Sequence, residues 1–353
     1  MIQIGTLFLC IVVLGVLLGV VYEILGARRD RRAHPPLGRL VSLGSHRLHL
    51  LESGQGTPTI VLEAGLMSTV LSWSELQLEL SHSFHVVSYD RAGLGWSDLG
   101  PMPRTADQIV DELHTLLERA EIAPPYLLVG HSFGGLTMPL FAARYPDEVV
   151  GMVLVDPVAP SEWNPPSEHD RKLARTGAKV CRRAAVLSRM GLIRFVAFLL
   201  TTSTAKKLAA NLVRLISRGA PADAGSVSSP WFLALPAKER DMARIFWVQQ
   251  KFASTIASQL ENLPVSAALA TEFGNFYDKP VAILSAHTSS EHRQNEHAAM
   301  AQRFDRGTHA TARKSNHWIM QEEPELVISA IEKVMEGCVV RSEQRKWETP
   351  LTA

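Results

Sequence analysis

The chain has 353 residues, of which 46% are hydrophobic and 20% are charged, and it contains 20 prolines and 23 glycines. This composition is that of an ordinary globular protein and excludes a disordered or collagen-like chain. The formal net charge of +1 gives no general attraction to nucleic acid, so we expect no such partner. The three cysteines are too few and too scattered for a disulfide framework or a zinc site.

The first 22 residues contain no charged side chain. A helix of that length extends ~33 Å, about the thickness of the hydrocarbon core of a bilayer. We therefore predict a transmembrane anchor at 1–26, followed by a basic linker at 27–38. A cleaved signal peptide is the alternative, although its basic start and its small-residue cleavage site are not evident here. Arginines follow the apolar segment and none precedes it, which predicts a single-pass protein with its bulk on the cytoplasmic side.

From residue 39 onward, short apolar runs alternate with amphipathic segments. Runs of this kind are typical of a parallel sheet that is covered on both faces. A helix is predicted at 105–120, where Thr105 and Gln108 have capping-box spacing, and a final helix is predicted to end at Gly337. The alternation indicates an α/β fold with helices on both faces of the sheet. A hairpin is predicted at 39–54, and buried strands are predicted at 59–65, 85–93, 126–132, 151–157 and 281–287.

The alternation stops between two parts of this core. The insertion contains helical segments separated by prolines and serines, and we predict that it forms a cap over the carboxyl edge of the sheet. Between Arg171 and Arg218 there are twelve Lys or Arg residues and no acidic residue, a composition that favours contact with an anionic membrane surface. A cap with solvated basic side chains is the alternative. The predicted divisions are a core at 39–158 and 279–337, a cap at 159–278 and a C-terminal tail at 338–353.

The sequence GHSFG at 130–134 lies between a predicted buried strand and a helix predicted at 133–145. A strand that turns directly into a helix raises the Ser132 hydroxyl above the sheet, beside the positive end of the helix. The two glycines leave room where the backbones cross. This nucleophile elbow predicts that Ser132 is a nucleophile; a glycine-rich structural turn is the alternative.

A serine nucleophile requires donors for the substrate oxyanion and a base. The N–H groups of Phe133 and of Leu66 are predicted to form the oxyanion hole, with Gly65 leaving room for the substrate. A plain turn at Leu66 is the alternative. Among the thirteen histidines, His317 is predicted to be the base, because it precedes the final helix and can reach over the sheet edge. His131 is expected to point the other way along the turn.

The motif GHSFGG, together with DRAGLGWSD at 90–98, the LEAG loop and His317 followed by QEEPELV, resembles the α/β-hydrolase superfamily. The resemblance covers residues 39–160 and 278–336. It implies an eight-stranded, mostly parallel sheet, a Ser–acid–His catalytic triad and neither cofactor nor metal. It also gives Asp90 and Arg91 a structural role near the oxyanion loop.

The expected acid of the triad is absent from its usual place. In the superfamily an Asp often follows the strand that here reads VAILSA, but this chain continues HTSSEH. Asp156 lies at the end of the preceding strand, where some members carry the acid, and Glu291 is further along the usual loop. The chemistry requires only a carboxylate that holds the histidine tautomer and steadies the imidazolium. We favour Asp156, with Glu291 as the alternative acid and a turn-capping role before Pro157 as the structural alternative for Asp156.

These residues predict a serine hydrolase that cleaves carboxylic esters through an acyl-enzyme on Ser132. Because the nucleophile is serine, the branches with an Asp nucleophile, the haloalkane dehalogenases and epoxide hydrolases, are excluded. The anchor and the apolar, basic cap favour an apolar or lipid-like acyl substrate at a membrane. Thioester hydrolysis, acyl transfer and hydrolysis of carbon–carbon bonds are alternatives within the same class. A catalytically silent, membrane-tethered binding protein is the alternative that the missing Asp favours.

Overall fold

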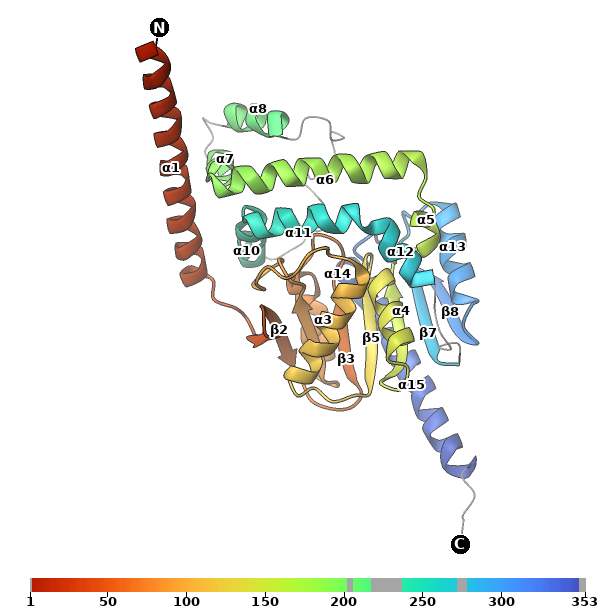
Figure 1. The fold of residues 1–353 in the computed structure, drawn as a ribbon. Helices are drawn as coiled ribbons and strands as arrows, with labels where there is room; N and C mark the ends of the chain where they lie inside the picture. The colour runs from red at the N-terminus through yellow and green to blue at the C-terminus, as the bar shows by residue number, and fades with distance from the viewer. Residues whose placement is uncertain (1, 202–205, 217–236, 272–277, 349–353) are drawn as a thin grey trace.

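An eight-stranded sheet, a helical cap over one of its edges and a long N-terminal helix beside the cap make up the chain (Figure 1). The computed structural model describes residues 2–201, 206–216, 237–271 and 278–348. The other positions of the predicted cap, and the predicted tail from 349 onward, lie outside the described residues.

The strand order in the sheet is β1-β2-β4-β3-β5-β6-β7-β8. Strand β2 pairs antiparallel with β1 and with β4, and the remaining neighbours pair parallel, so the sheet is mostly parallel. The predicted hairpin and the five predicted buried strands are all present. The strands are β1 (Arg39–Ser42), β2 (Arg47–Ser53), β3 (Thr59–Glu63), β4 (Val86–Asp90), β5 (Tyr126–His131), β6 (Val149–Val155), β7 (Pro280–Ser285) and β8 (Arg306–Thr311).

The strand β8 was not predicted from the sequence. Its residues, RGTHAT, are polar and mostly exposed or partly exposed, because β8 is an edge strand that pairs with β7 alone. A strand of this kind lacks the apolar run or the alternation that marks a buried strand. Strand β8 is therefore the one strand of the eight for which no segment was predicted.

The helix predicted to begin at Thr105 is present, but the last helix does not end where it was predicted to end. Thr105 caps α3 by accepting a hydrogen bond from the N–H of Gln108, but the Gln108 side chain contacts Glu112 and does not close a capping box. The last helix passes the predicted end at Gly337, since one glycine costs a helix only about 1 kcal/mol. The core helices are α2 (Ser74–Leu80), α3 (Ala106–Arg119), α4 (Gly134–Arg144), α13 (Glu291–Ala301), α14 (Ile319–Glu322) and α15 (Pro324–Glu348).

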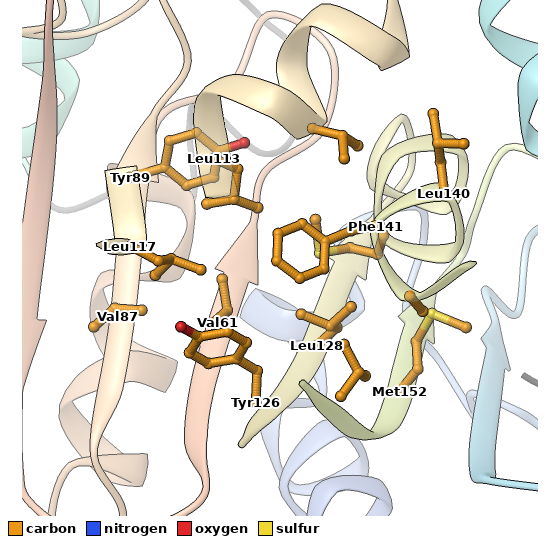
Figure 2. Packing of buried hydrophobic residues seen from close by; sticks show 14 of the residues in the cluster. Val61, Val87, Tyr89, Leu113, Leu117, Tyr126, Leu128, Leu140, Phe141 and Met152 are labelled. Atoms are coloured by element: carbon orange, nitrogen blue, oxygen red, sulfur yellow. The ribbon is translucent and has the colours of Figure 1, made fainter. Parts of the chain in front are cut away.

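Helices cover both faces of the sheet. On one face, Leu113 and Leu117 of α3 and Phe141 of α4 pack in the same cluster as Val61 and Leu128 of the sheet (Figure 2). On the other face, buried side chains of α15 pack against alternate residues of β5 and β6. Because successive side chains of a strand point to opposite faces, both faces of the central strands are apolar and buried.

The cap consists of two layers of helices (Figure 1). Helices α10, α11 and α12 form the layer nearer the sheet. Helix α6 lies over α11, and α7 and α8 lie at the end of α6 that is beside α1. The cap helices are α5 (Pro160–Trp163), α6 (Glu168–Arg189), α7 (Leu192–Thr201), α8 (Lys206–Ile216), α10 (Ala237–Trp247), α11 (Gln250–Glu261) and α12 (Leu263–Thr271).

The N-terminal helix α1 (Ile2–Ala33) stands beside the cap and extends beyond it (Figure 1). Its segment Gly5–Ala33 is long and apolar enough to cross a membrane, with a mean hydropathy of 2.7. The helix continues into the predicted basic linker, which is helical as far as Ala33. The anchor and the first arginines therefore belong to one continuous helix.

Candidate active site

Ser132 occupies a sharp turn between β5 and α4. Its backbone φ is +52°, a left-handed conformation that costs a non-glycine residue about 1–3 kcal/mol. Two hydrogen bonds hold this turn against the end of β6: the Ser132 N–H donates to the Val155 carbonyl at 3.1 Å, and the Val158 N–H donates to the Ser132 carbonyl at 2.8 Å. A Cβ on Gly130 would lie 2.7 Å from the Gly134 carbonyl oxygen, so glycine is required at position 130.

Strained backbone is concentrated around Ser132. The described residues include four non-glycine residues with positive φ, and three of them are Met67 at +63°, Ser132 and Asp156 at +41°. Met67 belongs to the loop predicted to hold the oxyanion, and Asp156 is the predicted acid. Strain of this kind persists where the surrounding structure imposes it, and it gathers at functional sites.

The loop after β3 lies directly beside Ser132. A Cβ on Gly65 would be 3.1 Å from the Ser132 Cβ and 2.8 Å from Nδ1 of His131, so only glycine fits there. Within the described part of the chain, the backbone N–H groups of Leu66 and Phe133 donate no hydrogen bond. Two unpaired N–H groups next to a serine hydroxyl are the arrangement that an oxyanion hole requires.

Arg91 holds this loop in place. Its guanidinium pairs with the buried carboxylate of Glu63 and donates to the carbonyl oxygens of Ala64 at 2.6 Å and Gly65 at 2.5 Å. Asp90 fixes the neighbouring chain by accepting hydrogen bonds from the N–H of Val70 and from the His49 ring. Both residues therefore have the structural role that was expected of them.

The structure joins His317 to Asp156. Nδ1 of His317 and one oxygen of Asp156 are 2.5 Å apart. The other oxygen accepts hydrogen bonds of 3.0 Å from the Ala286 N–H and the Ser289 hydroxyl. The loop that lacks the usual acid thus supplies donors to an acid on the neighbouring strand.

Glu291, the alternative acid, is exposed at the first turn of α13. No hydrogen bond or ion pair links it to His317 among the residues that the structure describes.

Asp156 is ionised in this setting. Burial alone would raise the pKa of its carboxyl, but the hydrogen bond and charge of His317, the charge of Arg293 and the Ala286 N–H together hold that pKa well below its usual range. A carboxylate that stays charged forces Nδ1 of His317 to be the donor, and this leaves Nε2 to accept a proton.

Two glutamates after His317 hold the loop that carries it. Glu323 accepts hydrogen bonds from the backbone N–H groups of Arg313, Lys314 and Ser315 at 3.1, 2.7 and 2.6 Å. Glu322 accepts one from the N–H of Asn316 at 2.8 Å. This function was not predicted from the sequence, although the acidic pair directly before Pro324 was the signal that could have indicated it.

His131 does not point away from the site, so that expectation is wrong. Its Nε2 donates to the backbone carbonyl of His317 at 2.8 Å, and its ring lies 4.5 Å from that of His317 and 4.7 Å from that of Trp318, centre to centre. Burial and the nearby charge of His317 lower the pKa of His131 well below 6.5, so the ring is neutral. His131 therefore helps to position His317 through its main chain.

Ser132 is only 9% exposed, and apolar side chains of the cap pack on Leu66 and Phe133. Leu66 and Phe133 pack in one cluster with Leu263 of α12, and Leu66 packs in a second cluster with Phe252 and Ile256 of α11. The surroundings of the two predicted oxyanion donors are therefore apolar. No group of three or more His, Cys, Asp or Glu residues in the described ranges could hold a metal ion.

A family described as alpha/beta hydrolase fold matches residues 58–324, more than half of the chain. The chain therefore belongs to the α/β-hydrolase family, as the resemblance of its motifs predicted. Membership supports a general hydrolase activity.

The relatives match only part of this chain. The uncharacterized protein YqjL of Bacillus subtilis (strain 168) is 42% identical over 104 residues, 30% of this chain and 41% of that protein. The 2-(acetamidomethylene)succinate hydrolase of Mesorhizobium japonicum is 31% identical over 120 residues, 34% of this chain and 42% of that protein. An uncharacterized vacuolar membrane protein of Saccharomyces cerevisiae is 32% identical over 110 residues, 30% of this chain and 17% of that protein. This chain thus spans less than half the length of each of these relatives.

Solved structures share the fold at low identity. An esterase of Thermogutta terrifontis is 20% identical with a TM-score of 0.58, over 85% of this chain and 98% of that one. An epoxide hydrolase of Bacillus megaterium is 15% identical with a TM-score of 0.59, over 84% of this chain and all of that one, 100%. These structures show the α/β-hydrolase fold, which supports several chemistries.

Replacing each candidate acid by its amide tests which of the two supports turnover. We expect Asp156→Asn to lower kcat for an ester by about 10⁴-fold, as when the acid of a catalytic triad is amidated, because the wrong tautomer of His317 is then favoured. Glu291→Gln should leave kcat within a few-fold of wild type. Steady-state kinetics on both variants, with circular dichroism to verify the fold, give the comparison, and the reverse ranking would contradict the assignment of Asp156.

Glu323→Gln should change the pH dependence of stability. Burial alone would raise the pKa of Glu323, but three backbone N–H groups lower it to about 2. An unfolded chain protonates such a carboxyl near pH ~4.3, so its stabilisation is complete above about pH 5 and is lost as the pH falls from about 4 to about 2. The gap in free energy of unfolding between wild type and variant, from urea titrations in detergent, should shrink over that range.

The matched control is Glu79→Gln, which alters an exposed carboxylate on α2. It should change the free energy of unfolding by less than about 0.5 kcal/mol. A gap for Glu323→Gln that stays constant from pH 6 to pH 2 would show that the carboxylate charge does not hold the 313–317 loop.

Proposed function

We propose that the protein is a serine hydrolase that cleaves carboxylic esters through an acyl-enzyme on Ser132. The observation that carries the proposal is the 2.5 Å contact between His317 Nδ1 and Asp156 at the sheet edge where Ser132 is held in a strained turn. The unpaired N–H groups of Leu66 and Phe133 support it further. The missing Asp after β7 favoured a catalytically silent protein, and the pairing of Asp156 with His317 weakens that argument.

In the proposed reaction, Nε2 of His317 takes the proton from Ser132 while Oγ forms a bond to the ester carbonyl carbon. The N–H groups of Leu66 and Phe133 stabilise the oxyanion, and Asp156 stabilises the imidazolium. The carbon–oxygen bond to the alcohol then breaks, and the alcohol leaves with the proton from His317. Water, deprotonated by His317, attacks the acyl-enzyme and releases the carboxylic acid and free Ser132.

The substrate class follows from the surroundings of Ser132. The cap side chains that pack on Leu66 and Phe133 are apolar, which favours an apolar or lipid-like acyl group over a charged one. Thioester hydrolysis and acyl transfer use the same acyl-enzyme and differ only in the leaving group or in the acceptor. Cleavage of carbon–carbon bonds is the remaining alternative that these residues permit.

We further propose that α1 is a single-pass membrane anchor and that the hydrolase domain lies on the cytoplasmic side. The length and hydropathy of α1 support the anchor, and the arginines at its C-terminal end support the orientation. The similarity to a vacuolar membrane protein of yeast is consistent with membrane association.

A fluorophosphonate probe and an ester series test the enzyme. We expect wild type to be labelled and Ser132→Ala to be unlabelled, because the probe reacts with an activated serine. Hydrolysis of p-nitrophenyl esters from acetate to palmitate should show a higher kcat/KM for the longer chains. Ser74→Ala, on the core helix α2, is the matched control and should keep both activities. A folded wild type that neither binds the probe nor cleaves any ester would favour a binding protein.

Protease digestion of sealed vesicles tests the orientation. In vesicles with the cytoplasmic face inside, the hydrolase domain should resist added protease until detergent opens the membrane, because the positive-inside rule places it in the lumen of such vesicles. Digestion without detergent would place the domain on the opposite side. A shortened chain that is released as a soluble protein would show cleavage of the N-terminal segment.

A further inference from the structure

The outermost helices of the cap expose apolar side chains. Helix α7 reads LIRFVAFLLT and contains a single charged residue, Arg194. Val196 and Leu199 on one face pack against α8, whereas Phe195 and Phe198 on another face are 43% and 55% exposed. A helix that is apolar on all sides belongs in a protein core or in lipid. The exposure of these two phenylalanines is therefore higher than the composition of α7 predicts for a helix in water.

Helix α8 adds to this face. It packs on α7 through Leu212 and Ile216, while Leu208 and Leu215 are 55% and 66% exposed. Scattered exposed leucines are normal, but exposed apolar side chains on two adjoining helices indicate an interaction site. We call this group the outer cap surface, and its residues are Phe195, Phe198, Leu208 and Leu215.

The outer cap surface is next to α1. Helix α1 lies against the turn between α6 and α7 (Figure 1). Among its residues whose side chains are described, the partly buried ones recur at intervals of three and four, so they form one stripe. The other side chains of α1 that the structure describes, from Gly5 to Ala33, are exposed. The stripe consists of Val16, Gly19, Val20, Glu23, Gly26, Ala27 and Asp30.

Glycines bring the two backbones into direct contact. A Cβ on Gly19 would lie 2.1 Å from the carbonyl oxygen of Met190, and a Cβ on Gly191 would lie 2.4 Å from the carbonyl oxygen of Gly19. Gly191 also has a φ of +73°, which favours glycine. The α6–α7 turn is thus fixed at the level of residue 19 of α1.

An ion pair locks the same contact. The Arg194 guanidinium donates from Nε and Nη2 to Glu23 at 2.8 and 3.1 Å, and from Nη1 to Asp30 at 2.5 Å. A Cβ on Gly26 would lie 2.7 Å from the Arg194 side chain, so this glycine makes room for the guanidinium. The one charge of α7 is thereby paired against α1 and withdrawn from the outer cap surface.

The contact sets the depth of α7 relative to the anchor. Gly19 precedes Glu23, the first charged residue of the chain, by four positions, which is ~6 Å along a helix. Amphipathic helices at a membrane surface bury their apolar faces about 5–10 Å into the boundary between headgroups and acyl chains. The level of the α6–α7 turn agrees with that range.

We propose that the outer cap surface lies in the bilayer beside α1, at an anionic membrane surface. This inference rests on the proposal that α1 crosses a membrane, and it adds a second membrane contact in the cap. Helices α6 and α8 also carry exposed basic side chains, which anionic lipids attract. These side chains are Lys172, Arg175, Lys179, Arg189 and Lys207.

Spin labels on the full-length chain test the proposal. Single cysteines replace Phe198, Leu14 in the middle of α1, and Leu78, an exposed residue of α2 in the core, after the three native cysteines are changed to alanine. The protein is reconstituted in vesicles of phosphatidylcholine and phosphatidylglycerol. The ratio of collision with oxygen to collision with a water-soluble nickel chelate should be several-fold higher at 198 than at 78, because oxygen dissolves in lipid and the chelate does not.

Three outcomes would overturn the proposal in different ways. A label at 198 as accessible to nickel as that at 78, with the label at 14 immersed, would leave the anchor intact and place the cap in water. Nickel access at 14 would remove both the anchor and the cap contact. Low access to both reagents with dipolar broadening at 198 would assign the surface to a second copy of the chain. None of these outcomes bears on ester hydrolysis, which is measured separately.

The variant Arg194→Gln tests the lock between the cap and α1. We expect it to lower the oxygen-to-nickel ratio at 198 several-fold, since Glu23 and Asp30 lose their partner. The matched control is Arg182→Gln, which breaks an exposed ion pair with Glu261 inside the cap and should leave the ratio unchanged. Equal ratios in wild type and Arg194→Gln would show that the ion pair does not set the depth of α7. An unchanged spectrum at 78 would verify the fold of each variant.

Discussion

The hydrogen bond between His317 and Asp156 is the interaction on which the candidate site depends, because it joins segments 161 positions apart in the chain. Each partner is fixed by a separate set of contacts. The loop after β7 binds one oxygen of Asp156, and the carboxylates of α14 and the following residue bind the backbone before His317. Parallel strands end at the same edge of a sheet, so the fold itself brings these segments close together.

The displaced acid shows that a carboxylate at the end of β6 reaches His317 where the usual position after β7 carries none. In this chain the β7 loop carries Ser289 and the Ala286 N–H toward Asp156, where they orient a carboxylate that belongs to β6. The carboxylate needs only to hold Nδ1 of His317 and to stay ionised, and its neighbours meet both conditions. The carboxylate oxygens must therefore lie at a defined place, whereas the strand that carries the acid can differ.

The cap connects the site to the N-terminal helix. Its inner layer packs apolar side chains on Leu66, a candidate oxyanion donor, and its outer layer packs on α1 through Gly19, Gly191 and the Arg194 ion pair. One insertion between β6 and β7 thus contacts both the candidate site and the N-terminal helix.

The sequence by itself determined the buried strands, the nucleophile turn and the apolar N-terminal helix, because each is encoded by a local pattern. It also placed Asp156 ahead of Glu291. It did not reveal β8, whose edge position removes the apolar signal, nor the packing of His131 on His317, nor the role of Glu323. Only the tertiary structure decided these and the pairing of Arg194 with α1, since each depends on residues that are distant in the chain and become neighbours only when the sheet and the cap are assembled.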